Sequence, residues 1–263
     1  KKLDRGTLTK HEIDEIIKDI VNNKLTEIEI TSFVCGCYIN RLTLYESAYL
    51  TEAIVANGKQ LDLDAYPILD KHSAGGVPGN RTTPLIVSII AAAGFTIPKT
   101  STRSITSVSG TADTVEVFAP VSHTKKKIEE IVKKTKGCMV WGGALELASA
   151  DDKLIKVERP LNLDPEGILL ASILAKKIAV RATHVLIDLP IGKGTKFQDM
   201  KRAKRVERKF KQLGKLLGLE IKVILTKGHQ PIGNGIGPAL EARDNLLILQ
   251  NKGPQDLKKK ALY

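Results

Sequence analysis

The spacing of hydrophobic residues in the first sixty positions predicts a set of helices. Apolar residues recur there at intervals of three and four, the period of one helical face: Ile13, Ile16, Ile17, Ile20 and Val21. The helix-capping pattern Thr-x-x-Glu stands at residues 9–12 and 43–46. A second helix is expected over residues 26–40, and Asn57-Gly58 is typical of a helix C-terminus. No strand pattern interrupts these segments, so we expect the helices to pack on one another.

From residue 66 onward, short apolar runs alternate with amphipathic segments. Strands are expected over residues 66–70, 95–97, 139–141, 183–189 and 220–225. Helices are expected over residues 83–93, 125–136, 164–179, 199–217 and 238–250, with another beginning near residue 256. Alternating strands and helices are typical of an α/β protein with a mainly parallel sheet covered on both faces.

The helix expected at 164–179 belongs with the N-terminal helices. Asp164 is the predicted N-cap and Pro165 the predicted first helical residue. We therefore expect a discontinuous helical lobe of residues 1–58 and 152–181, and an α/β lobe of residues 59–151 and 182–263. The active site is expected in the cleft between them. The chain has no initiating Met and stops inside an expected helix, so we expect a fragment truncated at both ends.

Composition narrows the class of protein. Charged residues make up 27% and hydrophobic residues 42% of the chain, which excludes wholesale disorder and a coiled coil. Lysine and arginine number 41 against 29 acidic residues, and the net charge of +12 favours anionic partners.

The sequence predicts a cytoplasmic protein without a metal site or a membrane span. The longest apolar stretch, residues 84–95, is too short to cross a bilayer, and the N-terminus has no apolar leader. The three cysteines Cys35, Cys37 and Cys138 lack the spacing of a zinc site. We expect them to be reduced thiols.

Two loops carry candidate chemistry. In residues 71–80, Lys71, His72 and Ser73 precede three glycines that let backbone N–H groups face a ligand, as in a phosphate cradle. A tight strand-to-helix turn explains this loop about equally well. Residues 100–116 combine hydroxyls, Arg103 and two carboxylates, which suit phosphate, although a polar surface loop is the simpler interpretation of that composition.

Three motifs together resemble the type II nucleoside phosphorylase family, which includes thymidine, pyrimidine-nucleoside and AMP phosphorylases. The first is Asp70-Lys-His-Ser-Ala-Gly-Gly-Val77. The second is Ser101-Thr-Arg103 followed by Gly110-Thr-Ala-Asp-Thr-Val-Glu116. The third is Ala171-Ser-Ile-Leu-Ala-Lys-Lys177. The resemblance covers nearly the whole chain.

The resemblance implies roles for individual residues. The residues implied in phosphate binding are Lys71, Ser73, Thr83, Ser101 and Thr111. His72 is implied beside the sugar and base, and Arg159, Ser172 and Lys176 match positions that hold the base. Asp164, Ser172 and Lys176 share one helical face by their spacing. Without the resemblance, a helix cap and a solvated polar stripe explain these three residues.

Three features point to the AMP branch of the family. The loop at 76–83 is one residue longer than in the pyrimidine enzymes, residues 102–107 replace a glycine-rich stretch, and Asp164 resembles the proton donor of that branch. The residues that match nucleotide-binding positions of the branch are Gly76, Thr102, Arg103, Ser104, Ile105, Thr106, Ser107, Thr111, Ser172 and Lys196. Arg103 and Lys196 are the candidate cations for a 5′-phosphate.

The implied activity is phosphorolysis of AMP, and of CMP and UMP as further candidates, by a homo-oligomer of at least two chains. Inorganic phosphate is the co-substrate and no cofactor is expected. One alternative is a thymidine or pyrimidine-nucleoside phosphorylase. Another is a non-catalytic nucleic-acid-binding module that uses the basic run at 201–211. We disfavour the module because a charged run on an amphipathic helix is usually a solvated face.

Overall fold

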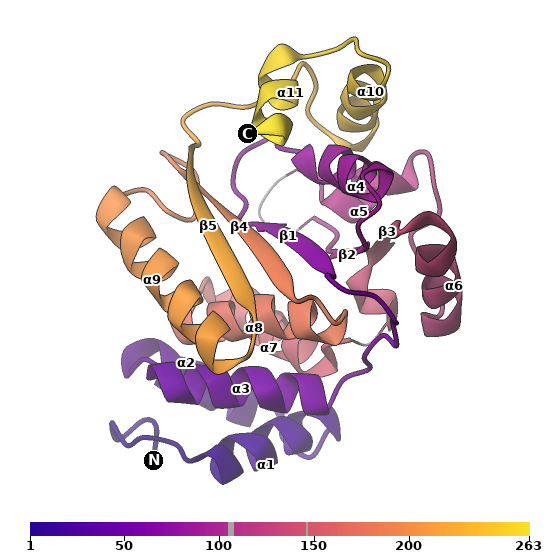
Figure 1. Ribbon diagram of the computed structural model, residues 1–263. Coiled ribbons are helices and arrows are strands. Elements are labelled where there is room, and N and C mark those ends of the chain that lie inside the picture. Colours follow the sequence, from indigo (N-terminus) through magenta and orange to yellow (C-terminus); the bar gives the residue numbers. More distant parts are fainter. Residues whose placement is uncertain (105–107, 146) are drawn as a thin grey trace. The chain divides into compact units, whose positions relative to one another are not determined.

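The computed structural model describes residues 1–104, 108–145 and 147–263 (Figure 1). The chain forms two compact units. Unit 1 comprises Lys1–Leu61, Glu146–Arg181 and Gln212–Gly218, and unit 2 comprises Asp62–Leu145, Ala182–Lys211 and Leu219–Tyr263. Unit 1 thus contains residues 59–61, 147–151 and 212–218, which the sequence analysis assigned to the α/β lobe.

Unit 1 is built from helices whose ends are set by local sequence. Its helices are α1 Lys10–Val21, α2 Glu27–Ile39, α3 Leu44–Ala56, α7 Ser149–Leu161 and α8 Glu166–Ala179. The predicted capping boxes at Thr9 and Thr43 are confirmed, and Thr26 forms a third one with Glu29. Each threonine hydroxyl accepts from the backbone N–H three residues on, which satisfies a donor that the helix leaves unpaired.

The core of unit 1 lies between helices that are distant in sequence. Helix α3 packs against both α1 and α8. Ile17 of α1, Ile54 of α3 and Ala175 of α8 have no exposed surface. Helix α7, which the sequence analysis did not outline, packs against α2 and α1 and contributes Leu154 to the same core.

Unit 2 contains the strands. They are β1 Leu69–Ser73, β2 Ile97–Ser101, β3 Gly137–Trp141, β4 His184–Ile191 and β5 Glu220–Lys227. The order is β1-β4-β5 in one sheet and β2-β3 in the other, and an isolated bridge between Ile68 and Thr96 joins the two. Every strand pair among the described residues is parallel, which confirms the predicted α/β class and parallel sheet. The predicted active-site cleft stays a prediction.

Helices connect and cover these strands (Figure 1). The helices assigned wholly to unit 2 are α4 Thr82–Ala92, α5 Thr111–Glu116, α6 Lys125–Thr135, α10 Pro238–Leu249 and α11 Gln255–Leu262. Both α4 and α6 pack on β2 and β3, and α4 also contacts α10 and α11. Helix α9, Met200–Leu216, runs from residues of unit 2 into residues of unit 1.

Two predicted strands were placed too early in the sequence. The strand expected at 66–70 is β1 at 69–73, and the one expected at 95–97 is β2 at 97–101. Lys71, His72 and Ser73 pair with Leu186, Ile187 and Asp188 of β4. Polar residues thus extend the strand because a neighbouring strand supplies backbone partners, a tertiary effect that local propensity does not contain.

Two helix predictions also need correction. Asp164 is not the N-cap of α8, because Pro165 occupies that position and makes no side-chain cap hydrogen bond. The segment 100–116 is not wholly loop, because residues 111–116 form α5. A side-chain interaction starts this short helix, since the Asp113 carboxylate accepts from the backbone N–H of Gly110 at 2.8 Å.

No helix in the described ranges combines the length and the apolar character needed to cross a membrane. The longest helix among the described residues, α9, has 17 residues and carries a strongly basic run.

Replacing Ile54 with Ala tests the core of unit 1. Ile54 is fully buried, so the shortened side chain loses its transfer free energy and leaves a cavity. We expect the free energy of unfolding to fall by about 2–5 kcal/mol, measured by urea unfolding monitored by circular dichroism. The matched control is Ile28→Ala on α2, where the side chain is 79% exposed and little change is expected. Equal effects at both positions would contradict this assignment of the core.

Candidate active site

The candidate phosphate-binding residues of unit 2 gather at the carboxyl ends of parallel strands. Ser73 ends β1 and Ser101 ends β2. The strand order is β3-β2-β1-β4-β5 across the joined sheets. From β1 the chain continues to β2 and β3 on one side, and then returns to β4 and β5 on the other side. Crevices at such a point, outside the carboxyl ends of the strands, are where open α/β sheets bind ligands.

Lys71 and Ser73 are held by neighbours from other segments. Lys71 is 3% exposed, and its ammonium donates to Thr82 Oγ1 at 2.9 Å. Ser73 Oγ donates to Asp188 Oδ2 at 3.0 Å and accepts from Asn80 Nδ2 at 3.2 Å. His72, between them on β1, is half-buried. The first motif therefore presents a cation, an imidazole and a hydroxyl from one strand.

Asp188 is a buried anion among donors and cations. Thr226 Oγ1 of β5 donates to its Oδ1 at 2.6 Å, and Lys260 Nζ of α11 lies 3.3 Å from its Oδ2. Burial alone would raise the pKa of Asp188, but the charges of Lys71 and Lys260 and the two hydroxyl donors lower it below its ordinary value. The carboxylate is therefore ionised at neutral pH.

The N-terminus of α4 lies beside this cluster. Thr82 and Thr83 are its first two residues and both are buried. Free backbone N–H groups and the helix dipole make such an N-terminus favourable for an anion. Thr82 already contacts Lys71, so the helix end and the cation point to the same place.

A buried network joins the two candidate loops. Arg81 Nε lies 2.7 Å from Glu241 Oε2 of α10, and the guanidinium also donates to the carbonyl of Ser109. Thr114 Oγ1 donates to Glu241 Oε2 at 3.0 Å. Burial lowers the pKa of Arg81, and the charge of Glu241 opposes that effect. The network fixes the start of α4 relative to the turn before α5.

Gly76 brings the first loop against the segment that carries Lys196. Its φ of +92° is a conformation that other residues rarely adopt. A Cβ there would lie 2.7 Å from Thr195 Cα and 3.4 Å from Lys196 N. The two predicted nucleotide-binding positions Gly76 and Lys196 are therefore neighbours in unit 2.

The second loop holds Arg103 with acidic partners. Its guanidinium lies 2.6 and 2.9 Å from the two carboxylate oxygens of Glu116 and 3.1 Å from Asp113, above the Trp141 ring. A phosphate bound by Arg103 would have to share the guanidinium with these carboxylates. The Asp113 carboxylate also accepts from Ser104 N at 2.8 Å, and Gly110 fits tightly against Thr102 O. The predicted nucleotide-binding residues Ile105, Thr106 and Ser107 lie outside the described residues.

Three polar atoms beside this edge are buried without a hydrogen-bond partner in the described part of the chain. They are Asn80 Oδ1, Thr100 Oγ1 and Ser101 Oγ. Buried polar groups are normally satisfied, so unpaired hydroxyls suit a site that donates to an incoming oxygen-rich anion. Thr111, the first residue of α5, is half-buried.

Unit 1 carries the candidate base-binding residues. Lys176 Nζ of α8 lies 2.6 Å from Asp151 Oδ2 of α7, and Asp151 has no exposed surface. Burial alone would lower the pKa of Lys176, but the Asp151 carboxylate raises it, so the side chain is an ammonium. Ser172 and Asp164 are half-buried, one turn and three turns before Lys176, and Arg159 on α7 is exposed. Lys176 is thus not part of a solvated stripe.

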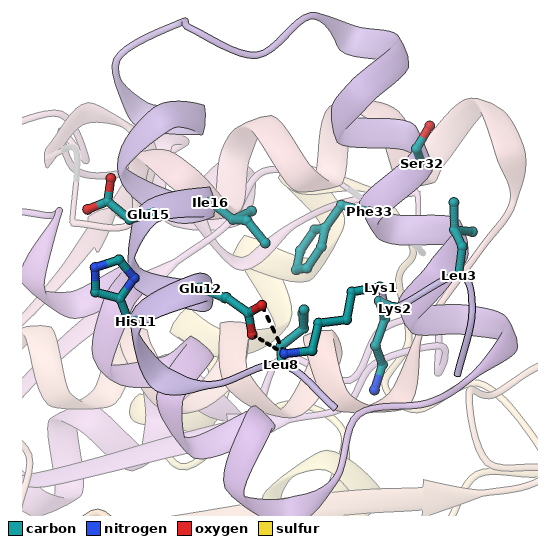
Figure 2. Close-up of a pocket in the computed structure, with 10 residues that line it drawn as sticks. All are labelled: Lys1, Lys2, Leu3, Leu8, His11, Glu12, Glu15, Ile16, Ser32 and Phe33. Carbon is teal, nitrogen blue, oxygen red and sulfur yellow. Dashed lines mark hydrogen bonds and ion pairs between the residues drawn. The ribbon is translucent and has the colours of Figure 1, made fainter. Parts of the chain in front are cut away.

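A separate cavity lies elsewhere in unit 1. Its volume is about 460 Å³, and it lies between the N-terminal segment, α1 and α2. Figure 2 shows Lys1 turned toward Glu12 at its rim, with Nζ 2.6 and 2.9 Å from the carboxylate oxygens, and Phe33 and Ile16 lining it. It contains none of the predicted site residues. Among the described residues, no group of three or more His, Cys, Asp or Glu could hold a metal ion.

Comparison with known families assigns both parts of the chain. The helical bundle domain of a glycosyl transferase family matches residues 1–58, and the α/β domain of a glycosyl transferase family matches residues 65–259.

The chain belongs to this glycosyl transferase family.

Curated relatives of this glycosyl transferase chain are similar over its whole length. It is 52% identical over 262 residues to the AMP phosphorylase of Thermococcus sibiricus and 53% identical to that of Thermococcus kodakarensis, covering 99% of the chain. It is 46% identical to a putative thymidine phosphorylase of Hahella chejuensis. The chain spans about half the length of these relatives, 52% in each case.

Solved structures share the fold. Anthranilate phosphoribosyltransferase from Thermus thermophilus matches with a TM-score of 0.75 over 99% of this chain and 84% of that one, at 15% identity. The Saccharomyces cerevisiae enzyme matches with a TM-score of 0.63 over 82% of this chain and 61% of that one.

The sequence analysis of the glycosyl transferase missed the acidic partners of its site. Asp188, Asp151 and Glu241 each hold a cation, and none was singled out. Asp188 did leave a signal, because it is the one charge in the apolar run Val185-Leu-Ile-Asp-Leu189 of an expected strand. Asp151 and Glu241 left none, because each meets its partner only in the folded chain.

Breaking the Arg81–Glu241 pair tests the buried network. We expect Glu241→Leu to lower the free energy of unfolding by about 3–5 kcal/mol, because it leaves Arg81 buried without its anion. The double variant Arg81→Met/Glu241→Leu should lose less than the sum of the single losses, measured by urea unfolding. The control is Lys156→Met, which breaks an exposed ion pair with Glu27 and should cost at most about 1 kcal/mol. Additive losses in the double variant would show that the two residues are not coupled.

Proposed function

We propose that the protein catalyses phosphorolysis of a nucleoside 5′-monophosphate, converting AMP and inorganic phosphate into adenine and ribose 1,5-bisphosphate. The observation that carries this proposal is the end of β1, where the Lys71 ammonium meets Thr82 at the N-terminus of α4 and Ser73 is the last strand residue. Thr83 follows on α4, and Ser101 ends β2. Relatives named AMP phosphorylase, 47–53% identical over nearly the whole chain, support the choice of AMP, and the phosphoribosyltransferase fold supports chemistry at a ribose.

In this reaction the phosphate-binding residues need to position the phosphate more than to activate it. A phosphate oxygen forms the new bond to the anomeric carbon while the bond from that carbon to the base breaks, through an oxocarbenium-like transition state. Lys71, the serine hydroxyls and the N-terminus of α4 would hold the phosphate and exclude the water that competes with it. Fixed donors in a dry site need no reorganisation as the charge moves.

The departing base needs a proton, and Asp164 is the proposed donor. The base leaves with the bonding electron pair, so a proton delivered to its ring nitrogen makes it a better leaving group. The half-buried position of Asp164 before α8, on the element that also carries Ser172 and Lys176, supports this role. Action in the cytoplasm, as a homo-oligomer without a cofactor, stays a prediction.

The decisive experiment measures phosphate-dependent release of free base by the full-length protein from AMP, CMP, UMP, adenosine and thymidine. We expect release from the monophosphates and not from the nucleosides, because the nucleosides lack the 5′-phosphate. Omitting phosphate is the control and should abolish release. Release from thymidine alone would establish the pyrimidine-nucleoside alternative instead. Release from none would leave the basic helix α9 and a nucleic-acid-binding role to be tested by filter binding across a salt series.

The Asp164→Asn variant tests the proton donor. General acid catalysis typically contributes two to four powers of ten, so we expect kcat to fall by about 100-fold or more. The affinity for AMP should change much less, because Asn has the same shape and still forms hydrogen bonds. Stopped assays of base release give kcat, and calorimetry gives the Kd for AMP. An unchanged kcat would remove Asp164 from the mechanism.

A further inference from the structure

Asp188 lies at the edge of the sheet where side chains that bind phosphate are expected, yet its own side chain is an anion. It pairs directly with Ser73 in the register of β1 and β4, the two strands that flank the reversal of connection direction in unit 2. Asp188 is 1% exposed within a strand whose other central residues, Ile187 and Leu189, are apolar and fully buried. A carboxylate beside a proposed phosphate site would repel that phosphate, so its presence there needs a separate explanation.

The contacts of Asp188 supply that explanation. An ionised carboxylate can only accept hydrogen bonds, so Ser73 must donate its hydroxyl hydrogen to Oδ2, at 3.0 Å. Thr226 donates to the other oxygen at 2.6 Å, which fixes the plane of the carboxylate. Asn80, from the loop before α4, contacts Ser73 Oγ on its other side at 3.2 Å. Ser73 is therefore held in one position by partners from two different segments, with its hydrogen on Asp188 and one lone pair left to accept from the P–OH group of hydrogen phosphate.

Asp188 also organises the cations. Lys260 Nζ of α11 lies 3.3 Å from its Oδ2 and 3.1 Å from Thr226 Oγ1, and the Lys71 charge acts on the same carboxylate. Without the anion, the ammonium groups of Lys71 and Lys260, two lysines with little exposed surface, would repel each other. A buried ion cluster is seldom more stable than apolar side chains of the same volume. The cluster around Asp188 is therefore better explained by the groups that it holds in place, Ser73 and the two lysines.

We propose that Asp188 is a positioning residue of the phosphate site, which holds Ser73 Oγ and balances Lys71 and Lys260 so that both are in place before phosphate arrives. The proposal rests on the proposed function for the identity of the anion. Asp188 itself makes no contact with phosphate and acts through Ser73 and the two lysines.

The test is the Asp188→Asn variant of the full-length protein, with inorganic phosphate as the probe. Asn keeps the volume but turns a donor toward Ser73 or toward Thr226 and Lys260. We expect the calorimetric Kd for phosphate, measured without nucleotide, to rise about ten-fold or more, the scale of one hydrogen bond to a charged group. The KM for phosphate should rise with it, whereas the KM for AMP should change less than about three-fold.

A mutant cycle shows whether Asp188 acts through Ser73. Ser73→Ala should weaken phosphate binding by itself, and adding Asp188→Asn to it should weaken binding much less than in the wild-type background. Fully additive effects would overturn the proposal. The matched control is Glu46→Gln, which neutralises a fully buried carboxylate of unit 1 that pairs with Lys2 at 2.8 Å and should leave the Kd for phosphate unchanged.

A second variant covers the case in which Asp188→Asn does not fold. Thr226→Val removes one donor to the carboxylate and keeps its charge, so we expect a smaller rise of about three-fold in the Kd for phosphate. An unchanged Kd in a folded Asp188→Asn, or in Thr226→Val when the first is unfolded, would overturn the proposal. Binding is read without nucleotide, so a wild-type protein that binds phosphate but releases no base would refute the proposed function alone.

Discussion

Parallel pairing of β1 with β4 is the constraint on which the rest of unit 2 depends. It draws the polar end of β1 into the sheet, where Lys71 is almost without exposed surface and Ser73 faces Asp188. A buried ammonium is tolerated only when partners surround it. Thr82 at the start of α4 and the Asp188 carboxylate supply them, so the strand register, the start of the next helix and the charges of the site are fixed together.

Three cations of the two units are paired in the same way. Lys71, Arg81 and Lys176 each face a carboxylate that is itself nearly or fully buried, at Asp188, Glu241 and Asp151. The chain has a large excess of positive charge, but these three cations are paired with carboxylates and do not contribute to that excess. They are neutralised locally, which lets the protein keep cationic donors in dry surroundings without the full cost of burying a lone charge. An anion that binds there competes with groups already in position.

The features that the sequence predicted well are those determined over a few residues. Thr9 and Thr43 begin helices because their hydroxyls and the following glutamates satisfy backbone groups within one turn. The strands beginning at His184 and Glu220 were predicted within a residue at their first positions, because their apolar runs are long. The resemblance to nucleoside phosphorylases named the candidate residues through contiguous motifs. The partners of those residues were missed, since Asp151 and Lys176, or Arg81 and Glu241, meet only through packing. The limits of β1 and β2 were misplaced for the same reason, because their polar ends become strand only beside β4 and β3.

The Arg81–Glu241 pair has a consequence for synthesis of the chain on the ribosome. Arg81 and the loop it anchors emerge early, whereas Glu241 belongs to α10, which is made near the end of the described sequence. At common rates of translation, the interval between them is on the order of ten to thirty seconds. During that interval the guanidinium cannot be buried with its anion, so the start of α4 and the turn at Ser109 lack their shared anchor. The candidate phosphate-binding loops are therefore completed late in synthesis, and the nascent protein cannot hold its two loops in register until α10 has left the ribosome.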